Sequence, residues 1–102
     1  MRHMVHFQVT VEQGLKIEAA GGPGKLIGYV AETYRPEQIY FCTTRREGWM
    51  FVDVDQQKAT ELMAILTRMT GSYPEIVPVL TAQEFAPYIG KVLSAVEKAP
   101  KL

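Results

Sequence analysis

The residues of this chain best suited to proton transfer are a histidine, a tyrosine and an aspartate. The ordinary pKa of a histidine such as His6 lies near neutrality, so its imidazole can move a proton to or from an enolisable ligand. Tyr40 can donate a hydrogen bond to a carbonyl or phenolic oxygen, and Asp53 can orient the imidazole or act as a base if it is buried. A simpler alternative remains open, in which His6 and Gln8 only form hydrogen bonds across a dimer and Asp53 lies at a solvated strand end.

Other residues with chemical potential lack the partners that their chemistry needs. His3 and His6 are three positions apart, which places them on opposite faces of a strand, so no metal site is expected. Gly24 and Lys25 are followed by Leu26, so the phosphate-loop pattern is incomplete. Cys42 has no histidine close in the sequence to activate it and is expected to be a small buried hydrophobe. The sequence predicts neither a metal nor a cofactor.

Length, charge and composition restrict the class of protein. The 102 residues suit a single domain spanning 1–102, and 11 basic residues balance 11 acidic ones. Since the positive charge is scattered rather than gathered in a stripe, we expect no nucleic-acid partner. No run approaches the roughly 20 apolar residues that span a bilayer, and the first residues do not resemble a signal peptide. We expect no membrane association and a cytoplasmic location.

The chain begins with an alternating segment typical of a strand, from residue 4 to residue 11. One face of it is apolar and the other is mixed. The apolar positions are Val5, Phe7, Val9 and Val11, and the mixed positions are Met4, His6, Gln8 and Thr10. Residues 12–24 are open to two interpretations, a hairpin or a short helix, and the glycines at their end interrupt regular structure.

The remaining pattern predicts two further helices and three strands, followed by an extra helix. A helix starts at Pro23 and ends before Pro36, since the residue preceding a proline avoids the α region. Two strands, 39–44 and 49–54, form a hairpin. Asp55 caps a helix that stops at Gly71.

The last strand and the last helix each contain a proline. The strand over 75–80 includes Pro78, which predicts an edge position or a bulge because proline cannot donate to a ladder. Thr81 and Glu84 have the spacing of a capping box, and Pro87 is expected to start the regular part of the final helix. The order of elements predicts an α+β fold, a ferredoxin-like βαββαβ antiparallel sheet with an extra C-terminal helix.

The stretch from Gln38 to Leu80 resembles the dimeric α+β-barrel superfamily. The resemblance rests on the hairpin 39–54, the helix 55–62 and the closing segment Glu75-Ile76-Val77-Pro78-Val79-Leu80. It is most similar to an uncharacterised family related to muconolactone isomerases and antibiotic-biosynthesis monooxygenases. The interrupted segment 12–24 departs from the long first helix of such proteins.

The resemblance implies a homodimer whose two sheets enclose a barrel, with the helices on the outer faces. The mixed face of the first strand would then point inward with His6 and Gln8, and Trp49, Phe51 and Asp53 would point inward from the neighbouring strand. Gln8, Trp49 and Phe51 would form the wall of a small-molecule site.

Two functions from different classes follow. The first is a small-molecule-binding dimeric barrel, such as an isomerase, cyclase or cofactor-free oxygenase acting on an apolar carbonyl or phenolic compound. His6 would transfer the proton, and Tyr40 and Asp53 would assist. The second is a non-catalytic structural or protein-interaction module, since a fold alone does not determine chemistry.

Overall fold

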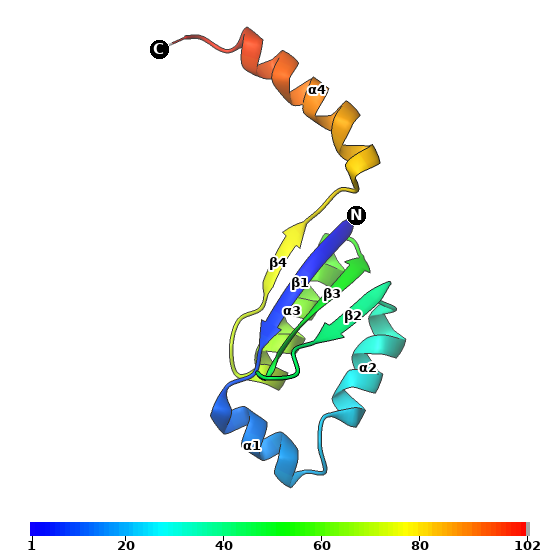
Figure 1. Cartoon of the computed structure of the whole chain (residues 1–102), viewed down its shortest axis with the longest axis vertical. Coiled ribbons are helices and arrows are strands. Elements are labelled where there is room, and N and C mark those ends of the chain that lie inside the picture. Colours follow the sequence, from blue (N-terminus) through cyan, green and yellow to red (C-terminus); the bar gives the residue numbers. More distant parts are fainter. Residues whose placement is uncertain (102) are drawn as a thin grey trace.

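A four-stranded antiparallel sheet lies at the centre of the fold, in the strand order β2-β3-β1-β4 (Figure 1). The computed structural model describes residues 1–101. The elements in chain order are β1 (Arg2–Gln8), α1 (Val11–Ala19), α2 (Gly24–Tyr34), β2 (Gln38–Phe41), β3 (Glu47–Asp53), α3 (Gln56–Thr70), β4 (Glu75–Pro78) and α4 (Ala82–Lys98). The predicted α+β class is confirmed. The sheet is open rather than closed, and its order is compatible with the ferredoxin-like arrangement.

One face of the sheet is covered by helices and holds the core. Side chains alternate along each strand, so Val5 of β1 and Met50 and Val52 of β3 point to the same side. Leu62 of α3 packs against them, and all four side chains are almost fully buried. Burial of each such side chain contributes about 1.5–3 kcal/mol. The core therefore fixes which face of the sheet is left uncovered.

Helices α2 and α3 are joined by a hydrogen bond beside this core. The Tyr34 hydroxyl at the end of α2 donates to Oε1 of Glu61 on α3, at 2.9 Å. Burial, together with the Glu61 carboxylate, raises the pKa of Tyr34 to about 12. The hydroxyl therefore remains protonated and continues to donate the hydrogen bond that links the two helices.

The first strand is shorter than the alternation predicts. The prediction of a strand through Val11 is wrong at its end, because Thr10 caps α1 by accepting a hydrogen bond from the Gln13 amide. Val11 is the first residue of the helix rather than an apolar strand residue, and Thr10 does not face inward from β1. Of the two interpretations of residues 12–24, the short helix is the one observed. Two glycines with positive φ, Gly21 and Gly22, then turn the chain.

The predictions for the middle of the chain are confirmed. The hairpin β2–β3 forms, although β2 ends at Phe41 rather than at residue 44 and β3 runs from Glu47 to Asp53. Asp55 caps α3 through the Lys58 amide, and Gly71 ends it at φ 80°. The edge position of β4, which includes Pro78, is also confirmed.

Helix α4 projects away from the rest of the molecule (Figure 1). The capping box of Thr81 and Glu84 is present, but the prediction that Pro87 starts the regular helix is wrong. The helix begins at Ala82 because the capping box already satisfies its first amides, and Pro87 lies inside it. None of its residues is buried. The radius of gyration is 17.4 Å, against about 13 Å for a compact chain of this length.

Candidate functional site

The uncovered face of the sheet places the predicted site residues in rows across the strands. In one row Glu75, His6, Trp49 and Tyr40 follow one another from β4 to β2. The next row contains Val77, Met4, Phe51 and Gln38, and Gln8 lies opposite Glu47 on the other side of the histidine row. Directly opposed side chains on one face have Cβ atoms about 5 Å apart. The face therefore joins a polar region to an aromatic and apolar one.

Both nitrogens of His6 face carboxylate oxygens. Its Nε2 lies 2.9 Å from Oε2 of Glu47, and its Nδ1 lies 3.2 Å from Oε1 of Glu75. An ionised carboxylate only accepts hydrogen bonds, so both nitrogens can donate at once only in the imidazolium. The ring also stacks on Trp49, with centroids 5.0 Å apart and planes 12° apart, which favours a cation above the indole.

These contacts shift the pKa values of His6 and Glu47 in opposite directions. The hydrogen bond to Glu47 raises the pKa of His6 above its ordinary value of 6.5, and Glu75 adds to this effect. The hydrogen bond donated by Gln8 lowers the pKa of Glu47, and the bond from His6 lowers it further. The contacts therefore favour an ionised carboxylate at Glu47 and an imidazolium at His6.

The two carboxylates that contact His6 differ in how freely their side chains can move. The Glu47 side chain is only 9% exposed and is held by Gln8, whereas the Glu75 side chain is 73% exposed on an edge strand. In the neutral imidazole, a proton on Nε2 that is donated to Glu47 leaves Nδ1 as an acceptor. Glu75 can turn into solvent and free Nδ1, so this nitrogen is the one available to a ligand.

The other predicted site residues lie at different distances from His6 and Glu47. Tyr40 is two strands from His6, about 10 Å away, on the far side of Trp49. Phe51 lies in the adjacent apolar row. Asp53 is not brought to His6, because it pairs with Arg2 at the end of the strand, and its carboxylate lies 2.8 Å from the Met1 amine. That amine lowers the pKa of Asp53, which is 69% exposed.

The more buried of the two acids that contact His6 is Glu47, which the sequence reasoning assigned to the hairpin connection. β3 begins at Glu47 rather than at Trp49, so the two side chains share a face. The sequence contained a signal for this contact, the two-residue spacing between Glu47 and Trp49. Side chains two residues apart point to the same face once the strand is extended back by two residues to Glu47.

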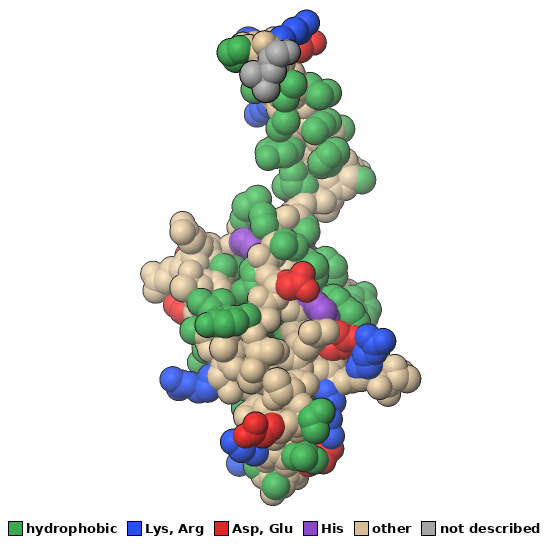
Figure 2. Space-filling view, turned by 90° about the vertical axis from the view of Figure 1, so that its left-hand side faces the viewer, with side chains coloured by type: hydrophobic (Ala, Val, Ile, Leu, Met, Phe, Trp, Pro, Cys, Tyr) green, Lys and Arg blue, Asp and Glu red, His purple; other side chains and the backbone are tan. Residues whose placement is uncertain are grey.

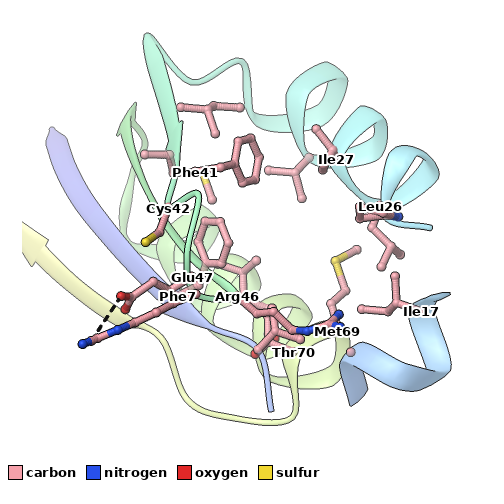
Figure 3. Close-up of a pocket in the computed structure, with 18 of the residues that line it drawn as sticks. Phe7, Ile17, Leu26, Ile27, Phe41, Cys42, Arg46, Glu47, Met69 and Thr70 are labelled. Carbon is pink, nitrogen blue, oxygen red and sulfur yellow. Dashed lines mark hydrogen bonds and ion pairs between the residues drawn. The ribbon is translucent and has the colours of Figure 1, made fainter. Parts of the chain in front are cut away.

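A cavity of about 310 Å³ lies on the opposite, helix-covered face (Figure 3). Phe7 and Phe41 of the sheet form one wall, and Ile17 of α1 with Leu26 and Ile27 of α2 form the other. Its volume is at the lower end of the range for small-ligand pockets. The sequence reasoning missed this cavity because it depends on how α1 and α2 stand over the sheet.

Charged residues surround the rim of this cavity. Arg46 forms an ion pair with Glu18 of α1, which ties the hairpin connection to the helix above it. Its side chain fills the space beside Gly14, where a Cβ atom would come within 2.7 Å of Nη1. Arg45 lies 3.8 Å from Glu47. Within residues 1–101, no cluster of three or more His, Cys, Asp or Glu side chains is placed to hold a metal ion.

The pH dependence of stability follows from His6. Because its pKa in the folded state lies above 6.5, the imidazolium stabilises the fold fully below about pH 6.5, and this contribution is lost as the pH rises through the folded pKa. We expect the free energy of unfolding of wild type to decrease as the pH rises above about 6.5, relative to that of His6→Gln, which does not titrate at this position. Urea unfolding at several pH values measures this difference. A difference that does not change with pH would contradict the assignment.

The chain is an α+β protein with an open four-stranded antiparallel sheet and four helices. Comparison with protein-family models, with curated proteins and with solved structures gives no significant match. Among the described residues, no helix is long and apolar enough to cross a membrane.

Proposed function

We propose that two copies of the chain place their uncovered sheet faces together in a dimeric α+β barrel and isomerise a small apolar carbonyl or phenolic compound between them. The observation that carries the proposal is the contact set of His6. A histidine held by the carboxylate of Glu47 and stacked on Trp49 lies on a sheet face that no helix of the chain covers. Two such faces would remove the aromatic and apolar rows from water.

The proposed reaction is a keto–enol isomerisation. Neutral His6 takes a proton from the carbon next to a carbonyl through Nδ1, and the electron pair of the broken C–H bond becomes the carbon–carbon double bond. The carbonyl oxygen gains the negative charge, while Tyr40 donates a hydrogen bond to a phenolic oxygen at the other end of the compound. The imidazolium then returns the proton to that oxygen, so no oxidant or cofactor is consumed.

Glu47 acts in this scheme as a positioning residue. Its carboxylate holds the proton on Nε2 and stabilises the imidazolium that forms when Nδ1 accepts the substrate proton. The separation of about 10 Å between His6 and Tyr40 suits a compound with one aromatic ring and a side-chain carbonyl. Trp49 lies between the two and would stack on the ring.

The test uses phenylpyruvate as the probe, because its enol absorbs in the ultraviolet and its keto form does not. We expect the wild-type protein to accelerate the conversion between the two forms above the rate in buffer. The acceleration should have a pH dependence that reports the raised pKa of His6. No acceleration at any pH between about 6 and 9 would overturn the isomerase proposal for this class of carbonyl.

The cavity under α1 and α2 supports a second candidate function, non-catalytic binding of an apolar ligand within one chain. We expect Leu26→Trp to fill part of the cavity and to abolish retention of an apolar fluorescent probe, 1-anilinonaphthalene-8-sulfonate, whereas His6→Gln should retain it. Fluorescence titration measures both affinities. Loss of binding in His6→Gln but not in Leu26→Trp would instead place the probe on the uncovered face.

A further inference from the structure

Helix α4 has an apolar face that its own chain leaves in water. Four of its residues recur at spacings of four, three and four, which aligns them on one side of a helix. They are Phe85, Ile89, Val92 and Val96, and they are flanked by Tyr88 and Leu93. Phe85, Tyr88, Leu93 and Val96 are each about half exposed or more. Figure 2 shows hydrophobic side chains along the projecting helix.

Most of the stability of a helix in a protein comes from packing of its apolar face, so this face is expected to have a covering surface. The chain holds α4 away from its own body at the first turn. Arg2 of β1 bonds to Glu84 at 2.9 Å, and Glu84 also completes the capping box with Thr81. Because the Val79 amide bonds to the Arg2 carbonyl, only a short connection remains in which the chain could reverse. The covering surface therefore belongs to another molecule.

The same chain carries a groove suited to a helix. The groove lies between α3 and β4, on the helix-covered side of the sheet, and has a volume of about 500 Å³. Its floor includes Ala59 and Met63 of α3 and Ile76 of β4, all partly exposed. Ala59 is small and permits close approach of a second helix. One end of the groove is Pro78, four residues before α4 begins.

We propose that α4 of one copy docks in the α3–β4 groove of a second copy, and that the exchange is reciprocal. The apolar face of α4 and the α3–β4 groove both become covered when two copies exchange helices about a two-fold axis. This inference concerns the opposite side of the sheet from His6. It does not depend on the proposed chemistry, but both proposals predict a dimer, so the experiments must detect the docked helix itself.

The area of the exchange is compatible with a stable dimer. A helix of 17 residues is about 25 Å long and about 10 Å wide. Two of them, each lying in a groove, remove about 1,000 Å² from water when both surfaces are counted. Stable interfaces begin at about 1,200 Å², so the two exchanged helices supply most of the area that such an interface needs.

The first test is a disulfide between copies. In a Cys42→Ser background, Met63→Cys is placed in one chain and Val92→Cys in a second, differently tagged chain, and the two are refolded together and oxidised. We expect a disulfide-linked pair containing both tags, and no linked pair from either chain alone. A third chain that carries both cysteines is oxidised alone. If it closes only within itself, α4 folds back onto its own groove, and if no disulfide forms in either experiment, α4 does not dock in the groove. Either result overturns the proposal.

The second test compares two faces of α4. Ile89→Asp puts a charge on the apolar face, whereas Ser94→Asp puts the same charge on the polar face. Because α4 has no buried residue within its own chain, both variants should keep the folded body, as judged by circular dichroism. Placed in the Val92→Cys chain, Ile89→Asp should lower the rate at which the disulfide-linked pair with the Met63→Cys chain forms at least about 100-fold, whereas Ser94→Asp should leave it within about twofold. This readout detects the docked helix and not a dimer of the uncovered sheet faces, and an unchanged rate in Ile89→Asp would overturn the proposal.

Discussion

Replacing His6 by glutamine is expected to lower the rate of phenylpyruvate enolisation by about 10²–10⁴-fold relative to wild type. Glutamine can still donate a hydrogen bond to Glu47, so the strand and its neighbours should keep their arrangement. It has no nitrogen that can accept a proton from carbon, because its amide is not basic near neutrality. The loss should therefore appear in turnover rather than in the affinity for the probe.

The matched control for this variant is His3→Gln. His3 lies on the same strand but on the opposite face, where its Nδ1 contacts the Met1 carbonyl at 2.9 Å. We expect the rate of this control to stay within about twofold of wild type. Glu47→Gln should shift the rate profile toward lower pH, since the hydrogen bond that raises the pKa of His6 is weakened. Equal rates in wild type and His6→Gln would remove His6 from the reaction.

Alanine at position 48 is expected to destabilise the fold by about 2–3 kcal/mol. Gly48 lies in β3 between Phe7 of β1 and Phe41 of β2, whose rings approach edge to face with centroids 6.2 Å apart. A Cβ atom there would come within 2.6 Å of both Cζ of Phe7 and the Tyr40 carbonyl oxygen. The aromatic ring can rotate, but the carbonyl can move only with its strand, so the β2–β3 pairing must shift.

The control for this variant is Gly28→Ala on α2, where a Cβ atom meets nothing within 4 Å. That change should stabilise the protein by about 0.5–1 kcal/mol, because alanine loses less conformational freedom in a helix. Urea unfolding of both variants gives the comparison. Since Gly48 also lies between Glu47 and Trp49, Gly48→Ala should move the histidine resonances of His6 in NMR spectra. A stability equal to that of wild type would show that β2 moves at little cost.

Local patterns were sufficient to predict the central elements of the fold. The capping role of Asp55, the stop at Gly71 and the edge position of Pro78 each follow from the chemistry of one residue and its neighbours. The end of β1 did not follow in this way. Thr10 fits the strand alternation as well as it fits a cap, and its use as a cap depends on contact with the end of α3, where its amide bonds to the Thr70 carbonyl.

The candidate site was predictable to the extent that strand alternation determines it. His6, Gln8, Trp49 and Phe51 share one face, as the period of two requires. The partner of His6 was not predictable from alternation alone, because Asp53 and Glu47 both occur on that face, six residues apart. Only the register of β1 on β3 places Glu47 beside the imidazole. The cavity depends in turn on the angle of α1 and α2, which no local pattern determines.

The two edge strands bear on the behaviour of the protein at high concentration. β2 and β4 are four residues long, and β4 ends in Pro78, which has no amide hydrogen to offer an added strand. Short edge strands, one of which ends in a proline, are poor templates for pairing with a strand of another chain, which is the step by which fibrils grow. We therefore expect that the chain can associate through its exposed apolar surface without forming fibrils, because its edge strands offer few backbone hydrogen bonds to an added strand.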